Sequence, residues 1–264
     1  NRLRTNFAFF LQRYEDKQTG TQTVTPAGTP VGRIINAGKA NIDGFEADIQ
    51  WRVTQNLTLG LGYSFLDAKY TDFKFRSNSA TDAIRYADCE RVAVIRSPTG
   101  TITEIRNAPV PAQPPGTVVN FFCDIDALKN RSLKLEDVPE HSLVFQARYE
   151  RPVAALGGSR WYIEGDSQVQ TERFIDPSNR RFVEDYVLAN LRIGLMGEDR
   201  RWEAMIYVNN LFDDDTILSA QDQPGEVDSG INTPNAFGPT DGLQIQLPDP
   251  RIIGLRFNWR FGGR

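Results

Sequence analysis

The side chains that could carry out chemistry are few in this chain and lie far apart in the sequence. Histidine occurs once, at His141, and the two cysteines, Cys89 and Cys123, form no CxxC pair. Hydrolytic triads and zinc sites need several such groups, each held by a defined partner. The sequence therefore argues against Ser-His-Asp or Cys-His catalysis and against a zinc or thiol redox centre.

Carboxylates are the other groups that could act as catalysts or ligands. Asp213 to Asp215 supply the hard oxygen ligands that Ca²⁺ takes, but without EF-hand spacing they are more typical of a solvated strand end. The acid and base of a glycosidase could be drawn from Glu46, Asp48, Glu164, Asp166 and Glu203. These five come from different strands and share a polar phase. They are therefore explained as part of a water-facing surface that carries both acidic and basic side chains. We expect no enzyme, no metal site and no cofactor, and calcium binding by the loops stays open.

Bulk composition excludes further classes of protein. The 264 residues carry 30 basic and 34 acidic side chains, a net charge of −4, and no basic cluster recurs on one face. Nucleic acid is therefore not expected as a partner. Mean hydropathy is −0.43, and no apolar run approaches the ~18 residues of a membrane helix. A β-barrel is compatible with these values, because barrel strands turn half of their residues toward a polar lumen.

The elements that must position these groups are strands. Between Asp43 and Val53, apolar and polar residues alternate with a period of two, which only an extended strand can use. After a turn at 54–56 the alternation resumes from Leu57 to Phe65, which predicts a hairpin with one apolar side. Each strand has the ~9–11 alternating residues that a tilted strand needs to cross a bilayer.

The same pattern predicts eight strands in all. They are Leu3–Tyr14, Asp43–Val53, Leu57–Phe65, Leu143–Tyr149, Trp161–Gln170, Val187–Leu195, Trp202–Val208 and Ile253–Phe261. The connections at 54–56, 152–159 and 197–200 are short, those at 15–32, 76–138 and 213–249 are long, and 176–181 is intermediate. Short turns at one end and long loops at the other are typical of an outer-membrane barrel, whereas a sandwich has no reason to segregate them.

Tryptophan placement favours the same architecture. All four tryptophans (Trp51, Trp161, Trp202 and Trp259) fall near the short-connection end on the apolar phase, as expected at a membrane interface, although they could be ordinary core aromatics. We therefore predict an all-β, transmembrane, antiparallel up-and-down β-barrel. The residues expected to face lipid include Phe45, Ile49, Leu59, Leu61, Ile193, Ile206, Leu255 and Phe257.

Three blocks carry a resemblance to a known family. They are NAGKANIDGFEADIQWRVTQNLTLGLGYSFLDAKY at 36–70, VNNLFDDD at 208–215 and PRIIGLRFNWRF at 250–261. With these blocks the chain resembles the C-terminal part of the barrel of a TonB-dependent outer-membrane receptor. The last block also resembles the signal that the barrel assembly machinery reads, through Gly254, Phe257, Trp259 and Phe261, although the family usually stops at the aromatic residue and this chain continues to Arg264.

The resemblance implies a place in the outer membrane of a Gram-negative bacterium. Family members have an N-terminal plug, which contacts an inner-membrane energising protein, and a barrel of twenty-two strands. We find no plug in this sequence and expect residues 1–264 to be the last eight strands, either from a mature N-terminus at Asn1 or as a piece of a longer protein. Open edges cannot sit unpaired in lipid, so other sequence or another chain must complete the barrel. The implied partners are outer-membrane lipid, the TonB-type complex through the missing plug, the barrel assembly machinery and a small-molecule or oligosaccharide ligand.

Binding is expected at the three long loops. Because an outer surface is oxidising, Cys89 and Cys123 in the longest loop are expected to form a disulfide, although they could instead be two free thiols. The side chains expected to contact ligand are Phe121, Phe122, Gln221 and Phe237. By resemblance the cargo is an iron–siderophore complex imported with energy from the TonB system, and glycans or cobalamin are rivals. The sequence is also compatible with a stand-alone eight-strand barrel used as an anchor or adhesin, and less so with a barrel enzyme.

Overall fold

The structure is a computed structural model that describes residues 2–24, 30–77, 87–129, 132–177, 179, 181–223 and 242–261. Its main feature is a meander of eight antiparallel strands, each hydrogen-bonded to the next one in this series. They are β1 (Leu3–Val24), β2 (Pro30–Arg52), β3 (Leu57–Ser77), β7 (His141–Pro152), β8 (Arg160–Gln170), β11 (Tyr186–Met196), β12 (Trp202–Asn209) and β15 (Ile252–Trp259). The predicted all-β, antiparallel order of strands is confirmed.

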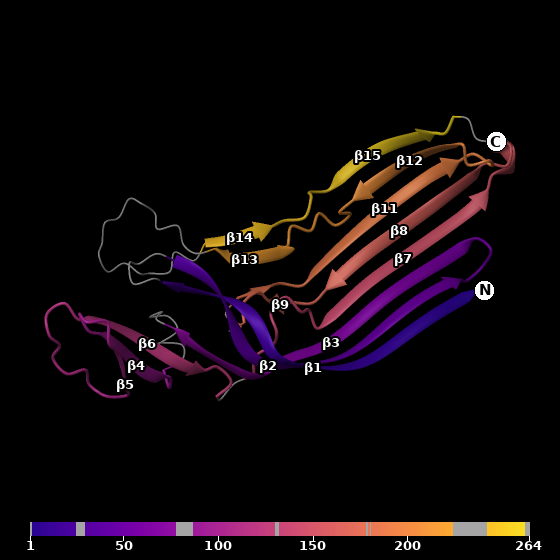
Figure 1. Ribbon diagram of the computed structural model, residues 1–264. Coiled ribbons are helices and arrows are strands. Elements are labelled where there is room, and N and C mark those ends of the chain that lie inside the picture. The colour runs from indigo at the N-terminus through magenta and orange to yellow at the C-terminus, as the bar shows by residue number, and fades with distance from the viewer. Residues whose placement is uncertain are drawn as a thin grey trace, which may run out of the picture.

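The meander is a curved, open wall (Figure 1). Its short connections and both chain ends lie at one end, and the elements of the longest connections lie at the other. β1 pairs with β2 and β15 with β12, and these two edge strands do not pair with each other in the described part of the chain. The wall is thus a partial, unclosed barrel, and a closed eight-strand barrel is wrong for this chain.

The connection expected at 15–32 is mostly strand. β1 continues to Val24 and β2 begins at Pro30, and they pair as far as Val24 opposite Pro30, with register shifts between Tyr14 and Gln18. The sequence pattern missed this extension because its threonines alternate with polar residues and glycine, leaving no apolar phase. β-branched threonine nevertheless fits a strand whose neighbour supplies backbone hydrogen bonds.

The other long connections also contain strands. Residues 76–138 hold β4 (Glu90–Arg96), β5 (Ile102–Arg106) and β6 (Val118–Asp126), in the order β6-β4-β5, with β6 pairing the outer end of β3. Residues 213–249 hold the hairpin β13 (Ser219–Gln223) and β14 (Gly242–Gln246), and 176–181 joins β9 (Arg173–Phe174) to β10 (Phe182–Val183). The prolines of 76–138 lie between these strands, where their missing N–H costs no ladder bond. A helical turn, η1 (Ala154–Leu156), completes the described elements, and no helix among them is long and apolar enough to span a membrane.

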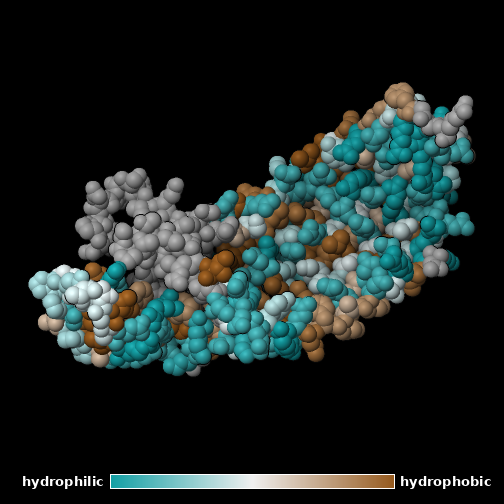
Figure 2. All heavy atoms as spheres, viewed as in Figure 1, coloured by the Kyte–Doolittle hydropathy of each residue, from teal (hydrophilic) through white to brown (hydrophobic). Residues whose placement is uncertain are grey.

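Cross-strand register gives the wall two unlike faces. One row of direct partners crosses six strands without a polar residue: Leu57, Tyr149, Ile163, Ile193, Ile206 and Leu255. Ile206 and Leu255 are 53% and 81% exposed, far more than a folding core would leave. The opposite face carries Arg148, Glu164 and Arg192 in one row, and hydrophilic residues predominate on the face turned to the viewer in Figure 2.

A packed cluster of buried residues lies at the long-connection end of the wall and includes residues of β2 and β3. It consists of Ala40, Ala68, Tyr70, Phe73, Cys123, Ile125, Ala127, Leu133 and Leu135. The segment before β7 runs back along β3, where Tyr70 N–H donates to Leu133 O at 2.9 Å and Leu135 N–H donates to Ala68 O at 3.0 Å. Buried side chains are fewer in the rest of the wall, and Tyr162 of β8, at 1% exposure, is one of them.

The two faces predict opposite responses to a new charge. Leu61→Arg, on the apolar face, should lower the free energy of unfolding in a bilayer by about 2–4 kcal/mol, because the guanidinium would enter hydrocarbon. Gln146→Arg, on the exposed polar face one row away, is the matched control and should be nearly neutral. Denaturant unfolding of the full-length protein in liposomes measures both. Water access at a cysteine replacing Leu61, with Gly60→Cys protected, would show that the faces are reversed.

Candidate functional site

A disulfide links the outer three-stranded sheet β4–β6 to the segment that directly precedes β4. Cys89 and Cys123 are bonded with their Cα atoms 5.6 Å apart, so the expected disulfide is confirmed. It links the residue before β4 to the middle of β6, and Ser77 of β3 pairs directly with Cys123. The disulfide therefore cross-links the sheet internally, and the backbone hydrogen bonds between β3 and β6 join the sheet to the wall.

An ion-pair cluster covers one face of this sheet. Arg76 binds Asp124 in bidentate fashion (2.5 and 2.8 Å) and also contacts Glu104 at 2.7 Å. Arg106 bridges the same two carboxylates and adds Glu90 at 2.8 Å. Hydrogen bonds from Arg76 hold the pKa of Asp124 and the pKa of Glu104 below their ordinary values. Every one of these charges is paired, so the cluster fixes β3, β5 and β6 together.

A second polar cluster ties the extended part of β1 to the segment that precedes β7. Lys17 Nζ lies 2.6 Å from Glu136 Oε1, and the hydroxyl of Tyr70 donates to Glu136 Oε2 at 2.6 Å. Burial opposes the charge on Glu136, but the bonds from Lys17 and Tyr70 outweigh it and its pKa lies below the ordinary value. Burial, and then the bond to Glu136, raise the pKa of Tyr70. Sequence reasoning missed this cluster because its members are up to 119 residues apart and no motif joins them.

Two of the expected ligand residues, Phe121 and Phe122, do not share a surface. Phe121 and Phe122 are neighbours in β6 and so point to opposite faces. Phe121 is 67% exposed, whereas Phe122 lies under the Arg76 guanidinium at 5.8 Å on the ion-pair face. The backbone of Gln221 pairs with Gln244 in the β13–β14 hairpin, and Phe237 lies outside the described residues. Their contact with a ligand stays a prediction.

A cation that forms no ion pair with any described residue lies near Phe121. Arg91 of β4 is the direct partner of Cys123, and Phe121 is the partner of Ala93, so Arg91 and Phe121 are diagonal neighbours on one face. Diagonal pairs are about 7–8 Å apart, within reach of long side chains. Arg91 is exposed and its guanidinium forms no ion pair with any described residue.

The carboxylates considered as catalysts belong to the polar face of the wall. Glu164 and Asp166 both contact Arg192, at 3.4 and 2.5 Å, and Glu164 also contacts Arg148. Glu203 accepts hydrogen bonds from Tyr162 at 2.7 Å and from Asn258 at 3.2 Å. Glu46 and Asp48 lie exposed on β2. Only Glu164 and Asp166 are brought together, and the arginine between them makes them part of a charge ladder.

The aspartates at 213–215 cap backbone groups. Asp213 accepts from Arg251 N–H and Asp214 accepts from Val187 N–H and Thr216 N–H, each at 2.9–3.0 Å. Asn210, at a left-handed φ of 50°, donates to the carbonyls of Asp214 and Asp249. The VNNLFDDD block therefore closes the outer end of β11, β12 and β15, and no metal-binding group of three acidic, histidine or cysteine residues exists among the described residues.

The remaining sequence candidates lie on the apolar face, except Gly254, which lies on the opposite face of β15. His141 contacts Tyr63 Oη through Nδ1 at 2.8 Å and its ring lies 5.2 Å from that of Phe65. Phe257, Trp259 and Phe261 of the closing block are 63%, 50% and 88% exposed, and a Cβ on Gly254 would collide with the ring of Tyr207. Their recognition by the assembly machinery stays a prediction.

Comparison with known proteins identifies relatives by both sequence and shape. The family model "TonB dependent receptor-like, beta-barrel" matches residues 1–211. The siderophore receptor PiuA from Acinetobacter baumannii superposes with a TM-score of 0.57 at 15% identity, over 98% of this chain and 26% of that one. The Ferric-Catecholate import receptor Fiu from E. coli K12 gives 0.53 at 16%, over 98% and 25%. This chain thus spans about a quarter of the length of these proteins, and no curated protein matches it.

The disulfide predicts a selective loss of loop stability. Its two cysteines are 34 residues apart, a loop for which cross-linking restricts the unfolded chain by about 3–4 kcal/mol. The double variant Cys89→Ser, Cys123→Ser should therefore make β4–β6 sensitive to protease while the wall keeps its resistance to denaturant. Mass spectrometry of unreduced peptides checks the bond itself. Alkylation of both thiols without reductant would contradict it.

The ion-pair cluster predicts loosening in acid. The folded pKa of Asp124 is depressed, so its stabilising effect is complete above the unfolded value and is lost as the pH falls through the folded value, below about pH 4. Hydrogen-exchange protection factors of β6 should therefore drop below that pH and stay constant from about pH 5 to 8. Arg76→Gln should remove most of the pH dependence. An unchanged protection factor at about pH 2.5 would exclude the role of this cluster.

Proposed function

This chain belongs to the TonB-dependent receptor β-barrel family, and we propose that it forms the last eight strands of an outer-membrane receptor that binds a scarce external ligand and imports it. The observation that carries the proposal is the division of the wall. An exposed apolar face suits lipid, a charged face suits a water-filled lumen, and long, structured connections gather at one end. In this arrangement the short turns face the periplasm and β4–β6 face the outside.

The free edges support membership in a larger barrel. β1 and β15 each leave one side of their backbone unpaired among the described residues, which hydrocarbon does not tolerate. The strands that pair with them, and the plug that would respond to a TonB-type protein, must come from sequence outside these 264 residues. Assembly into the outer membrane through the barrel assembly machinery, with the closing block as its signal, is part of the same proposal.

The cargo we propose is an iron–siderophore complex. Two proteins of similar structure are a siderophore receptor and a ferric-catecholate import receptor. On this chain, the exposed ring of Phe121 lies beside the guanidinium of Arg91, which has no ion pair among the described residues. This pair suits an anionic, aromatic ligand, because the ring can stack and the cation neutralises charge. Nothing comparable marks the described surface for an oligosaccharide or cobalamin, and both serve as rival cargoes in the uptake assay.

Replacing the outer sheet tests whether it carries recognition. Ser77 and Cys123 are direct partners, so an Asn-Gly turn can replace residues 78–122 without moving the wall, with Cys123→Ser added. In the full-length protein this change should abolish uptake of the cargo under iron limitation. A parallel replacement of 220–245 between the paired Ser219 and Gln246 tests the other hairpin. Loss of growth on one cargo alone names the substrate, and undiminished uptake of ferric siderophores, cobalamin and oligosaccharides would refute the role of β4–β6.

Two point variants test the same surface without removing it. Phe121→Ala and Arg91→Ala should each weaken binding of a ferric siderophore about tenfold, as expected for an interface anchor. Ile102→Ala is the matched control, because Ile102 is 65% exposed on the opposite face of the same sheet. Equal affinities for all three variants and the parent protein, by fluorescence quenching on purified receptor, would place recognition elsewhere.

A further inference from the structure

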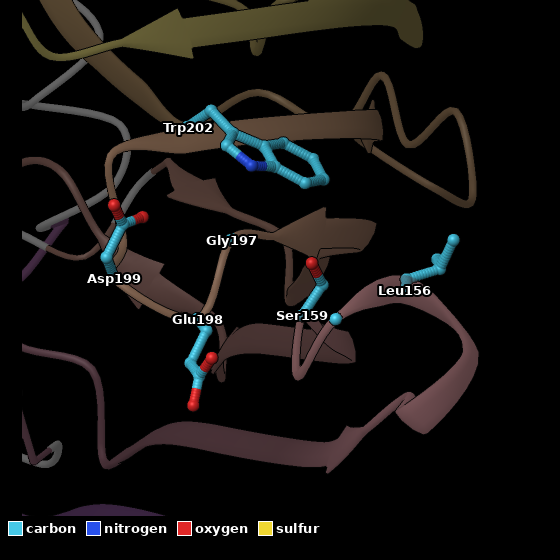
Figure 3. A pocket seen from close by; sticks show the side chains of 7 residues that line it. Leu156, Ser159, Gly197, Glu198, Asp199 and Trp202 are labelled. Carbon is cyan, nitrogen blue, oxygen red and sulfur yellow. The ribbon is translucent and has the colours of Figure 1, made fainter.

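A pocket of about 460 Å³ lies between two short connections at the periplasmic end of the wall. It is lined by Leu156, Gly157, Ser159, Gly197, Glu198, Asp199 and Trp202. The first three come from the connection between β7 and β8, and the others from the turn between β11 and β12 and the start of β12 (Figure 3). No residue expected to contact cargo lines it.

Three polar groups around this pocket have no partner in the described part of the chain. Ser159 is only 6% exposed, yet its hydroxyl makes no hydrogen bond and points toward Trp202 across the pocket (Figure 3). The indole N–H of Trp202 and the carboxylate of Glu198 likewise have no hydrogen bond or ion pair. Asp199 differs, because it is paired with Arg201 at 3.2 Å. Ser159 Oγ is not among the buried side-chain atoms that lack a partner in the described residues, so it is open to solvent, and a ligand that bonds to it replaces water.

Two glycines allow Glu198 and Trp202 to lie close to the backbone. A Cβ on Gly158 would lie 2.7 Å from Glu198 Oε2, and one on Gly197 would lie 2.6 Å from Trp202 Nε1. Gly157 and Gly158 also have left-handed φ angles of 60° and 80°, which other residues rarely adopt. The carboxylate and the indole can therefore approach the backbone more closely than any other residues at these two positions would allow.

The pocket lies where the apolar face reaches the short-connection end of the wall. Ser159 lies two residues before Trp161, and Gly197 lies two residues after its direct partner Leu195, so both positions are on the same face as that pair. Trp202 lies two residues before Ala204, the partner of Leu195 on β12, and is on the same face. Leu156 is 51% exposed at the rim and Trp259, the partner of Trp202, is 50% exposed. In the bilayer this is the depth at which hydrocarbon meets lipid headgroups.

We propose that this pocket binds the phosphoethanolamine headgroup of a phospholipid, an inference that rests on the proposed membrane placement. Glu198 supplies the counter-charge for the ammonium, and the Ser159 hydroxyl and Trp202 N–H donate to the phosphate oxygens. Leu156 contacts the first methylene groups of an acyl chain. An anionic headgroup without an ammonium would meet the uncompensated carboxylate of Glu198. The trimethylammonium of choline has no N–H to donate to that carboxylate, so the site discriminates by charge and by hydrogen bonding.

Native mass spectrometry of the full-length receptor tests the proposal. The protein is released from nanodiscs that contain equal amounts of phosphatidylethanolamine, phosphatidylcholine and phosphatidylglycerol, and the retained lipid is identified. Phosphatidylethanolamine should be retained about tenfold over either competitor, and Glu198→Gln and Ser159→Ala should each remove that preference. Gln55→Ala, in the other short turn of the same end, is the control and should leave it unchanged.

The outcomes separate this inference from the proposed function. A receptor that inserts and transports but retains the three lipids equally would overturn the pocket assignment and leave the function intact. Failure to insert into any bilayer would overturn both. Free glycerophosphoethanolamine has the headgroup but no acyl chain. If it displaced the bound lipid as effectively as the intact lipid does, the assignment would also be overturned, because the acyl contact with Leu156 would then contribute nothing. The comparison of three lipids uses the unmodified protein, so it decides the assignment even if a substituted protein folds poorly.

Discussion

Pairing of backbone N–H and C=O groups along strand edges is the constraint on which the rest of the structure depends. The edge of β3 shows it most clearly. Residues 57–65 pair with β7, residues 68–70 bond to Leu133 and Leu135, and residues 74–77 pair with β6. One strand edge is thus covered in succession by three segments of its own chain, and this is what brings the outer sheet against the wall.

Once register is fixed, the chemistry of each face follows from the period of two. A shift of one residue would move the row through Ile163, Ile193 and Ile206 to the charged side. The charged side is stabilised by pairing charges across strands, as Arg192 does with Glu164 and Asp166. Removing one partner of such a pair is costly because it leaves a charge without compensation. Polar and apolar rows therefore enforce the same register.

Groups that could bind something else are found where this pairing stops. In the described part of the chain, Arg91 and Phe121 at the outer end, and Ser159 and Glu198 at the short-turn end, have polar or aromatic surface that no neighbour satisfies. Between them, the acidic and basic side chains of the wall are largely committed to one another. A rigid wall with variable connections is suited to recognition at both of its ends, because the connections can vary without disturbing the strands.

Alternation with a period of two is a local signal, so the sequence was enough to predict the eight wall strands, their order, their two faces and the segregation of short and long connections. It also placed the cysteines together in the longest connection. Tertiary structure alone decided that 15–32 and 76–138 contain strands, since polar threonine-rich and proline-interrupted segments have no apolar phase until a neighbouring edge pairs with them. It alone separated Phe121 from Phe122 and assembled Lys17, Tyr70 and Glu136. Contacts between residues so far apart depend on register and on chain reversal, which no spacing of residues encodes.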